Sequence, residues 1–336
     1  MYMISSECGI GILSVKHYLP SKILTNEELC KNIEGLTQEW IIEKTGIKRR
    51  YYISDTETAS SMAIDVSRRL IEENKINPKE IGLIIIASFS QDYLFPPLSA
   101  KIHSAIGASK DCQIIDINTN CVGLVTATTI AAEKMKLNDK IKYSLIIGVE
   151  VLSAFTNLKD KDTAIFFSDG ASGILLGKVK SGYGYINSKF TTDSSTYESV
   201  RMRGGGSMYP PNKLLNNLAV NNIEQNGLAT WKQAITNLPP VIKELIKDND
   251  LEMEDIDFFI FHQANSFLIN YILGKLKIPR EKTYTNVEEI GNTGSASIGI
   301  ALSEAYSKGL IKSNSTILIA GVGAGFNFGA NLWKIL

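Results

Sequence analysis

The fold class is decided by two matching stretches, DVSRRLIEENKINPKEIGLIIIAS (residues 65–88) and LPPVIKELIKDNDLEMEDIDFFIFHQ (residues 238–263). Each stretch begins with apolar residues at helical spacing, continues through a short polar linker and ends in a continuous apolar run. The two apolar runs, Leu83–Ala87 and Phe258–Phe261, are typical of strands that are buried on both faces. The pattern therefore predicts a helix and a buried strand in each stretch.

A second pair of stretches extends the similarity in the same order. Residues 121–150 and 294–323 each contain a helix rich in small side chains, then a polar turn, then an apolar strand that reaches a glycine. Generic alternation of strands and helices is the alternative explanation, but the order and spacing of the elements also agree. A repeat this long predicts two similar α/β halves, because solenoid repeats have periods of roughly 20–50 residues.

The small-residue helices indicate how the halves pack. Small side chains let a helix approach other elements closely, so we expect these two helices between two sheets, with further helices outside. This predicts a five-layer α-β-α-β-α architecture. We place the halves at residues 1–180 and 181–336. Residues 181–231, rich in Gly, Asn, Ser and Tyr, are expected to form strand and loop excursions that shape a binding site.

Composition excludes several classes of protein. Hydrophobic residues make up 44% of the 336 residues, and Lys+Arg equals Asp+Glu at 35 each, which argues against disorder and against a protein that coats nucleic acid or an anionic membrane. No apolar run reaches the ~18 residues of a membrane span, and the first residues are too few for a leader peptide. The four cysteines are scattered, which favours a reducing compartment and argues against zinc. We expect a cytoplasmic protein without a metal site.

Three residues could carry chemistry. Cys121 follows a predicted strand, Gln113–Ile117, and opens a helix, where the helix dipole and unpaired N–H groups would lower the thiol pKa. His262 follows the strand Phe258–Phe261, at the carboxyl end where α/β sheets place ligands. Asn292 precedes the second small-residue helix, near the position that the repeat relates to Cys121. Each has a structural alternative: a buried cysteine, a core histidine or a simple turn. Convergence of the three near a pseudo-two-fold axis is what favours function.

The segment Gly-Val-Gly-Ala-Gly-Phe-Asn-Phe-Gly, residues 321–329, follows the predicted strand Thr316–Ala320. It is not a phosphate-binding loop, because no Lys-Ser/Thr pair follows and a strand to Leu336 fits the sequence better than a helix. Its glycines predict a close approach of the backbone to a ligand.

The chain resembles the β-ketoacyl-acyl carrier protein synthase III family of the thiolase superfamily. The resemblance spans nearly the whole sequence and rests on a set of short motifs in a fixed order. These are Tyr18-Leu19-Pro20, Thr25-Asn26-Glu27-Glu28-Leu29, Trp40-Ile41, Lys44-Thr45-Gly46-Ile47, Phe95-Pro96, Cys121-Val122-Gly123, Ser168-Asp169-Gly170-Ala171, His262-Gln263-Ala264-Asn265, Gly291-Asn292-Thr293 and the final glycine-rich loop.

The resemblance implies a thiolase-like fold, a homodimer and a ping-pong Claisen condensation that needs no metal or redox cofactor. Cys121 would take an acyl group from acyl-CoA, with the N–H groups of Cys121 and Ala324 as the oxyanion hole. His262 and Asn292 would then assist decarboxylation of a malonyl thioester, carried by an acyl carrier protein or by CoA. The rival readings are an acyltransferase that passes the acyl group to a hydroxyl or amine, and a non-catalytic acyl-binding partner subunit.

The resemblance also assigns binding residues and exposes departures. Positions that contact CoA or the carrier arm would be Trp40, Lys44, Lys161, Lys232, Asn265 and Lys275, with solvated surface lysine as the alternative for Lys232 and Lys275. Phe95 would line the acyl pocket of the partner in a dimer. The family pattern has Arg where Phe267 stands, an aromatic residue where Val322 stands, and small alanines where Thr119 and Asn120 stand. These departures favour a specialised paralogue, of secondary metabolism, over a housekeeping initiator of fatty acid synthesis.

Overall fold

The computed structural model describes residues 8–213 and 218–336. Most of the segment that was considered as a leader therefore lies outside the described residues, as does a short piece of the 181–231 excursion.

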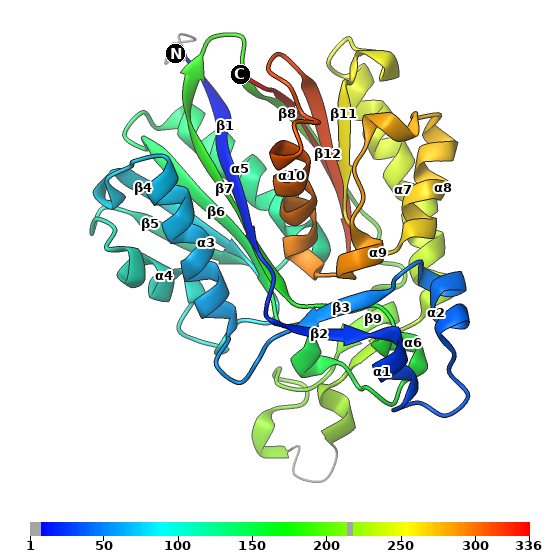
Figure 1. Ribbon diagram of the computed structural model, residues 1–336. Coiled ribbons are helices and arrows are strands. Elements are labelled where there is room, and N and C mark those ends of the chain that lie inside the picture. The colour runs from blue at the N-terminus through cyan, green and yellow to red at the C-terminus, as the bar shows by residue number, and fades with distance from the viewer. Residues whose placement is uncertain (1–7, 214–217) are drawn as a thin grey trace.

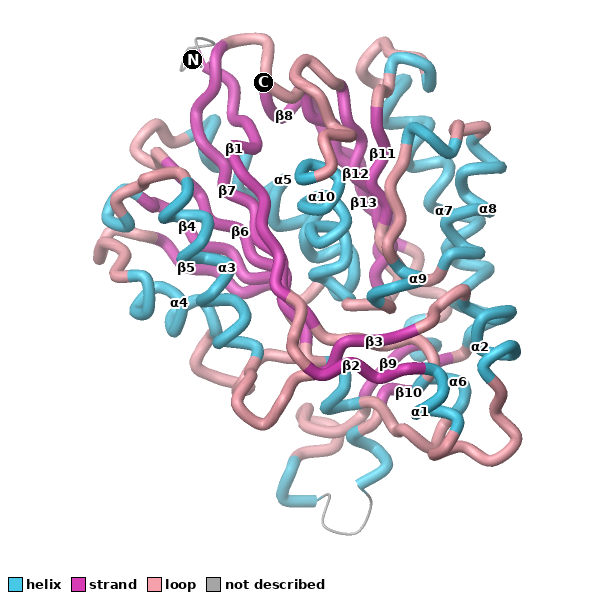
Figure 2. Tube along the Cα trace, viewed as in Figure 1, coloured by secondary structure: helices cyan, strands magenta, loops and turns pink. Residues whose placement is uncertain are grey.

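Two sheets form the framework (Figures 1 and 2). The first has five strands in the order β1 (Cys8–Tyr18), β7 (Gly170–Lys180), β6 (Tyr143–Glu150), β4 (Ile81–Ala87) and β5 (Gln113–Ile117). The second has four, in the order β11 (Phe258–Phe261), β12 (Thr316–Gly323), β13 (Asn327–Lys334) and β8 (Gly184–Thr192). Strand β4 runs parallel to β5 and β6, and β11 runs parallel to β12, so the apolar runs found in the sequence are buried parallel strands.

The helices lie in three layers around these sheets. Between the sheets lie α5 (Gly123–Leu137) and α10 (Ser297–Ser307), the two small-residue helices (Figure 1). Outside the first sheet lie α3 (Ala59–Glu73) and α4 (Leu98–Ile106), and outside the second lie α7 (Gly227–Lys247) and α8 (Ser266–Leu276). The expected five-layer α-β-α-β-α architecture, with its thiolase-like duplication, is therefore confirmed.

Shorter elements cover one end of the sheets. They are β2 (Lys22–Thr25), α1 (Asn26–Cys30), α2 (Gln38–Thr45), β3 (Arg49–Tyr52), α6 (Lys161–Ala164), β9 (Val200–Met202), β10 (Ile223–Gln225) and α9 (Val287–Ile290). Strands β2 and β3 pair with each other, as do β9 and β10. The 181–231 segment thus contributes β8 to the second sheet and the β9–β10 pair to the covering end.

Two elements are longer than the sequence repeat indicates. Helix α7 begins at Gly227 and continues through Pro239 and Pro240, because its apolar face is buried on both sides of the two prolines. Strand β12 extends past Ala320 to Gly323, since Gly321, Val322 and Gly323 pair with β13. The glycine-rich segment is therefore the turn of a hairpin, and the strand expected after it is β13.

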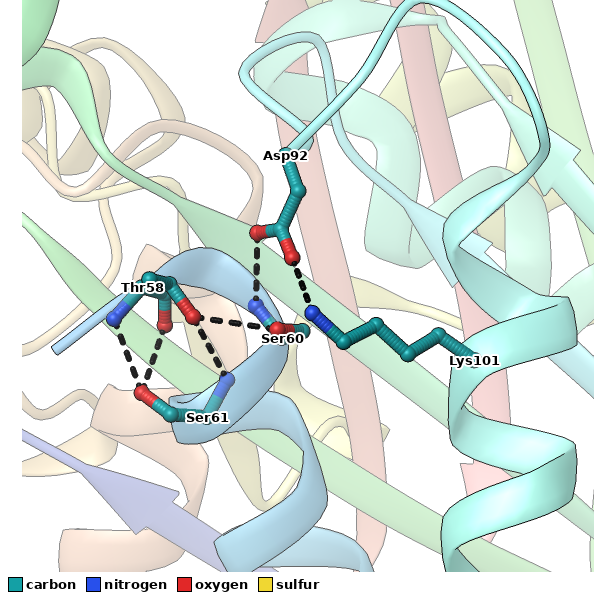
Figure 3. Close-up of polar contacts among 5 residues, drawn as sticks. All are labelled: Thr58, Ser60, Ser61, Asp92 and Lys101. Atoms are coloured by element: carbon teal, nitrogen blue, oxygen red, sulfur yellow. Dashed lines mark hydrogen bonds and ion pairs between the residues drawn. The ribbon is translucent and has the colours of Figure 1, made fainter.

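The turn after β4 is held to the rest of the protein at Asp92, and the three residues that follow Asp92 are exposed. The carboxylate of Asp92 accepts a hydrogen bond from the Ser60 backbone N–H (3.1 Å) and pairs with Lys101 Nζ (2.8 Å), as Figure 3 shows. Thr58 caps the same end of α3 through Ser61, so Asp92 is attached to a rigid helix terminus. The next three residues, Tyr93, Leu94 and Phe95, are 65%, 69% and 84% exposed. We call these three residues the apolar turn.

Other structural findings bear on the sequence expectations. The four cysteines, all among the described residues, are unpaired. Residues 8–213 and 218–336 contain no group of three or more His, Cys, Asp and Glu side chains that could hold a metal ion. No helix in these same ranges is long and apolar enough to cross a membrane.

We expect Asn331→Ala to destabilise the layered core. The buried Asn331 amide donates to Val125 O and Thr128 Oγ1 of α5, and its oxygen accepts from Trp333 Nε1 (2.9 Å). Removing the amide leaves the indole N–H without its acceptor, which should cost about 1–3 kcal/mol of unfolding free energy. Urea unfolding measures the loss. The exposed Asn138→Ala change is the control, and an equal effect of both changes would contradict the assignment.

Candidate active site

Cys121 lies where the first sheet meets the central helix. It follows β5 and the turn 118–120, and belongs to the 3₁₀ turn η2 (Asn120–Val122) that leads directly into α5. Asn120 has φ +52°, a left-handed conformation that Asn adopts more readily than most residues. Its side-chain amide donates to Ala324 O (3.3 Å), which ties the Cys121 turn to the hairpin of the second sheet.

The β12–β13 hairpin packs directly on this turn. A Cβ atom at Gly323 would lie 2.4 Å from Thr119 O and 3.2 Å from the Val122 nitrogen, so no larger residue fits there. The sequence predicted close approach of these glycines to a ligand. Gly323 approaches the backbone that carries Cys121, because the hairpin and the nucleophile turn come from opposite sheets and meet between them. A close approach of the segment to a ligand stays a prediction.

His262 continues β11, since its backbone N–H donates to Ala320 O (2.9 Å). Its ring Nδ1 lies 2.6 Å from Ser297 Oγ, and that same oxygen accepts from the Gln263 backbone N–H (3.3 Å). The contact fits the tautomer in which Nδ1 accepts the Ser297 hydroxyl proton and Nε2 carries the hydrogen. Burial lowers the pKa of His262 to about 4, so the ring is neutral at pH 7.

Asn292 is held by its backbone on one side and by its own turn on the other. Its N–H donates to Phe166 O (2.9 Å), and its carbonyl accepts from Ser168 N–H (2.9 Å). The preceding Gly291 has φ +82° and lies against the side chains of Ser168 and Arg50, which requires glycine at this position. Asn292 Oδ1 accepts from the Gly294 N–H (2.9 Å), so the amide NH₂ remains as the donor end of the side chain.

One cavity of about 890 Å³ is lined by Cys121, His262 and Asn292 together. Its walls also include Ile165, Phe166, Phe167, Val322 and Phe326, so much of the lining is apolar. The convergence expected from the repeat is therefore present: a thiol, a neutral imidazole and an amide donor open on the same space.

The electrostatics of Cys121 differ from the sequence expectation. Burial of the thiol, with a further contribution from the charge of Glu150, raises the pKa of Cys121 to about 12, and only its own backbone N–H acts in the opposite direction. The expected lowering of the pKa at the helix N-terminus is thus wrong for the free protein. Desolvation of the thiolate among largely apolar side chains outweighs the favourable end of the helix.

Comparison with known proteins identifies the family of this chain. Family models described as 3-oxoacyl-(acyl-carrier-protein) synthase III and its C-terminal part match residues 115–194 and 246–335. The β-ketoacyl-(acyl-carrier-protein) synthase III of Caldanaerobacter subterraneus subsp. tengcongensis is 34% identical over 324 residues, which cover 96% of this chain and 97% of that protein. The chain belongs to the 3-oxoacyl-(acyl-carrier-protein) synthase III family.

Solved structures of the synthase III family and of related enzymes share the fold. The Aquifex aeolicus 3-oxoacyl-(acyl-carrier-protein) synthase III superposes with a TM-score of 0.88 at 30% identity, covering 97% of this chain and 100% of that one. The priming β-ketosynthase of the R1128 polyketide pathway superposes with a TM-score of 0.89 at 25% identity, covering 98% and 97%.

The structure separates the other residues that were predicted for this synthase III site into two groups. Trp40, Lys44, Asn265 and Ala324 line the cavity, and so does Phe267. Lys161 is not among the lining residues, but its Nζ lies 5.8 Å from the centre of the Trp40 ring, and Lys44 Nζ lies 6.0 Å from the same centre.

Three further predicted residues also do not line the cavity. Lys275 Nζ donates to Ile235 O (2.8 Å) and lies over the Tyr271 ring, and Lys232 is an exposed neighbour of the lining residue Trp231. Phe95 belongs to the apolar turn and is exposed. Within a single chain, these three are therefore outside the pocket that holds Cys121.

Sequence reasoning missed two residues that affect the site. Ser297 holds the His262 ring, but in the sequence it is one of several small residues that open α10. Glu150 contributes to the raised pKa of Cys121, and its only sequence signal is a carboxylate at the end of a strand that is otherwise apolar. The sequence could have indicated a buried carboxyl group at the end of this strand, but it could not show which residues lie around it.

We expect Asn120→Ala to destabilise the protein by about 1 kcal/mol, because alanine tolerates the left-handed conformation less well and lacks the tether to Ala324. Asn120→Gly separates the two causes, since glycine keeps the conformation but loses the tether. Chemical unfolding and the rate of Cys121 alkylation by iodoacetamide measure the effects. If Asn120→Ala and Asn120→Gly are equally damaged, the conformation is not the cause.

Proposed function

We propose that this protein is a condensing acyltransferase that joins an acyl group to a malonyl-derived two-carbon unit. Cys121 is the nucleophile, and His262 and Asn292 are the hydrogen-bond donors for the second half-reaction. The observation that supports this most strongly is the shared cavity, which is lined by one thiol and two neutral donors from both sheets.

In the first half-reaction the Cys121 sulfur attacks the carbonyl carbon of an acyl-CoA. The C–S bond to CoA breaks, and CoA leaves as the free thiol with the proton that Cys121 gives up. The backbone N–H groups of Cys121 and Ala324 are the proposed oxyanion donors, and both residues line the cavity. Because the pKa of Cys121 is raised to about 12, the resting residue is a thiol, and acylation should accelerate as pH rises through the neutral range.

In the second half-reaction a malonyl thioester enters and loses CO₂. The electron pair of the broken C–C bond becomes an enolate, whose oxygen receives hydrogen bonds from His262 Nε2–H and the Asn292 NH₂ group. The enolate carbon attacks the acyl thioester on Cys121 and releases a β-ketoacyl thioester and the cysteine. A histidine whose pKa is lowered to about 4 stabilises this charge as a neutral donor, so the step should not lose His262 function between pH 7 and pH 5.

The rim of the cavity is the proposed entry for the CoA nucleotide or the carrier arm. Trp40 with Lys44 and Lys161 offers an aromatic face and two cations to an adenine and its phosphates. Lys232, Asn265 and Lys275 are proposed as further contacts, although Lys275 must first release Ile235 O. Phe267 at the mouth gives an apolar surface where the family resemblance implies an arginine, which favours free malonyl-CoA or an unusual carrier as donor.

Several wider expectations belong to the same proposal. The thiol, the imidazole and the amide supply the chemistry of both half-reactions, so the reaction needs no metal or redox cofactor. We place the boundary of the two halves at residues 180 and 181, with the nucleophile in the first half and His262 and Asn292 in the second. A cytoplasmic location and a specialised role in secondary metabolism remain predictions from sequence.

We expect Cys121→Ala to abolish formation of an acyl adduct. Asn292→Ala should retain the adduct but lose at least about tenfold in condensation, because one donor to the enolate oxygen is removed. Intact mass after mixing with a panel of acyl-CoAs measures acylation. Labelled malonyl-CoA and malonyl carrier protein then test condensation through CO₂ and β-ketoacyl product.

Other outcomes of this experiment identify the rivals. An ester or amide product without CO₂ release indicates transfer to oxygen or nitrogen. Absence of any adduct on Cys121 with every acyl-CoA indicates a non-catalytic acyl-binding subunit. Normal condensation by Asn292→Ala contradicts the role given to Asn292.

We also propose that two copies of the chain associate through the apolar turn and β5. The apolar turn exposes Tyr93, Leu94 and Phe95 side by side, which is costly in water. Strand β5 pairs only with β4 among the described residues, so its other edge is open to a strand of a second copy. In such a dimer Phe95 would reach the acyl pocket of the partner.

Phe95→Asp should weaken the dimer, because it puts a charge into a buried apolar contact. Light scattering coupled to size exclusion, over a range of concentrations, measures the mass. Leu137→Asp is the matched control, since Leu137 is also an exposed apolar residue (76%) but lies at the far end of α5. A monomeric parent protein, or equal effects of both changes, contradicts this dimer.

A further inference from the structure

A buried carboxyl group lies behind the proposed active site and has no part in the steps described above. Glu150 ends β6 and has no solvent exposure. Its carboxylate accepts hydrogen bonds from Ser90 Oγ and from the Phe89 backbone N–H (3.3 Å), both in the turn after β4. Ser90 Oγ in turn accepts from the Val151 N–H (2.8 Å), so the carboxylate and this turn form one connected group.

Glu150 also touches the segment that carries Asn292. A Cβ atom at Gly294 would lie 2.9 Å from Glu150 Cγ, and the Gly294 N–H is the group that fixes Asn292 Oδ1. Gly294 begins the 3₁₀ turn η9 (Gly294–Ala296), whose Ser295 backbone also donates to the carboxylate. Glu150 therefore lies at the entry of α10, and η9 packs against η2, which holds Cys121.

The surroundings of this carboxyl group contain few other charges. The turn after β4 presents Ser88, Phe89 and Ser90, and η9 presents Gly294 and Ser295. The charge of Glu150 raises the pKa of the Cys121 thiol, which belongs to η2, the turn that packs against η9. Burial raises the pKa of Glu150 to about 8, against the opposing effect of its hydrogen bonds, so its charge changes within the range where enzymes work.

Two anions on neighbouring packed turns repel each other when little water lies between them, so the pair accommodates one negative charge more easily than two. The Cys121 thiolate therefore forms most easily while Glu150 is protonated. We propose that Glu150 is a positioning residue for the nucleophile: its carboxyl group, when ionised, opposes formation of the Cys121 thiolate, and when neutral it permits it. This inference rests on Cys121 as the nucleophile, and it adds a built-in control of how reactive that thiol is.

Alkylation of Cys121 by iodoacetamide tests this directly, followed from pH 6 to pH 10 by mass spectrometry of the Cys121 peptide in the intact protein. In the parent protein the logarithm of the rate should rise with pH and flatten near pH 8, where Glu150 ionises. Glu150→Gln keeps acceptors for Ser90 and Phe89 but cannot ionise. The rate of Glu150→Gln should rise with pH without the inflection and should exceed the parent rate above pH 8. The gain should be about threefold for each unit by which the thiol pKa falls, and not tenfold, because a less basic thiolate is also less nucleophilic.

Matched variants decide the remaining cases. Asp169→Asn removes another buried carboxylate whose pKa is raised by burial but which does not act on Cys121, so its profile should keep the inflection. Ser90→Ala removes a hydrogen bond that lowers the pKa of Glu150, so the inflection should move to higher pH. This variant replaces Glu150→Gln as the test if Glu150→Gln does not fold. An inflection that persists in Glu150→Gln, stays in place in Ser90→Ala or disappears in Asp169→Asn overturns the inference. Alkylation needs no acyl donor, so this result is independent of whether the protein condenses acyl groups.

Discussion

The close meeting of two helix entries between two sheets is the constraint on which the rest of the structure depends. Helices α5 and α10 share one layer (Figure 1). The short 3₁₀ turns before them, η2 and η9, pack against each other. Small side chains are needed there because two sheets and two helices approach within van der Waals distance. This crowding brings backbone N–H groups, a thiol and two hydrogen-bond donors to one place.

Elements that are distant in the sequence hold each residue of the proposed site. Cys121 and Asn292 are held from the opposite half of the chain, and His262 is held from another helix of its own half. Asn120 ties the Cys121 turn to Ala324, and Phe166 pairs with the backbone of Asn292. Ser297 orients the His262 ring from α10. Because these restraints cross between layers, the geometry of the site is as stable as the packing of the layers themselves, and it does not depend on a single flexible loop.

Desolvation controls the chemistry more than any individual charge. The same burial that keeps His262 neutral, and hence a pure donor, also keeps Cys121 protonated and Glu150 close to its titration point. In the proposed reaction, a pocket that stabilises a diffuse enolate by neutral donors must exclude water. Such a pocket then disfavours every localised anion, including the thiolate that the reaction needs. The Glu150 carboxyl group makes this balance depend on pH, because its own charge is added to that of the thiolate.

The amino-acid sequence was enough to predict the layered α/β fold and to single out Cys121, His262 and Asn292, which the structure brings to one cavity. Strand runs such as Phe258–Phe261 and the paired small-residue helices are local patterns that packing did not overturn. The sequence could not predict the raised pKa of Cys121, the contact of Ser297 with His262 or the packing of Gly323 against Thr119. These depend on which side chains distant segments bring to one buried point, and burial is a property of the assembled layers that no local pattern encodes.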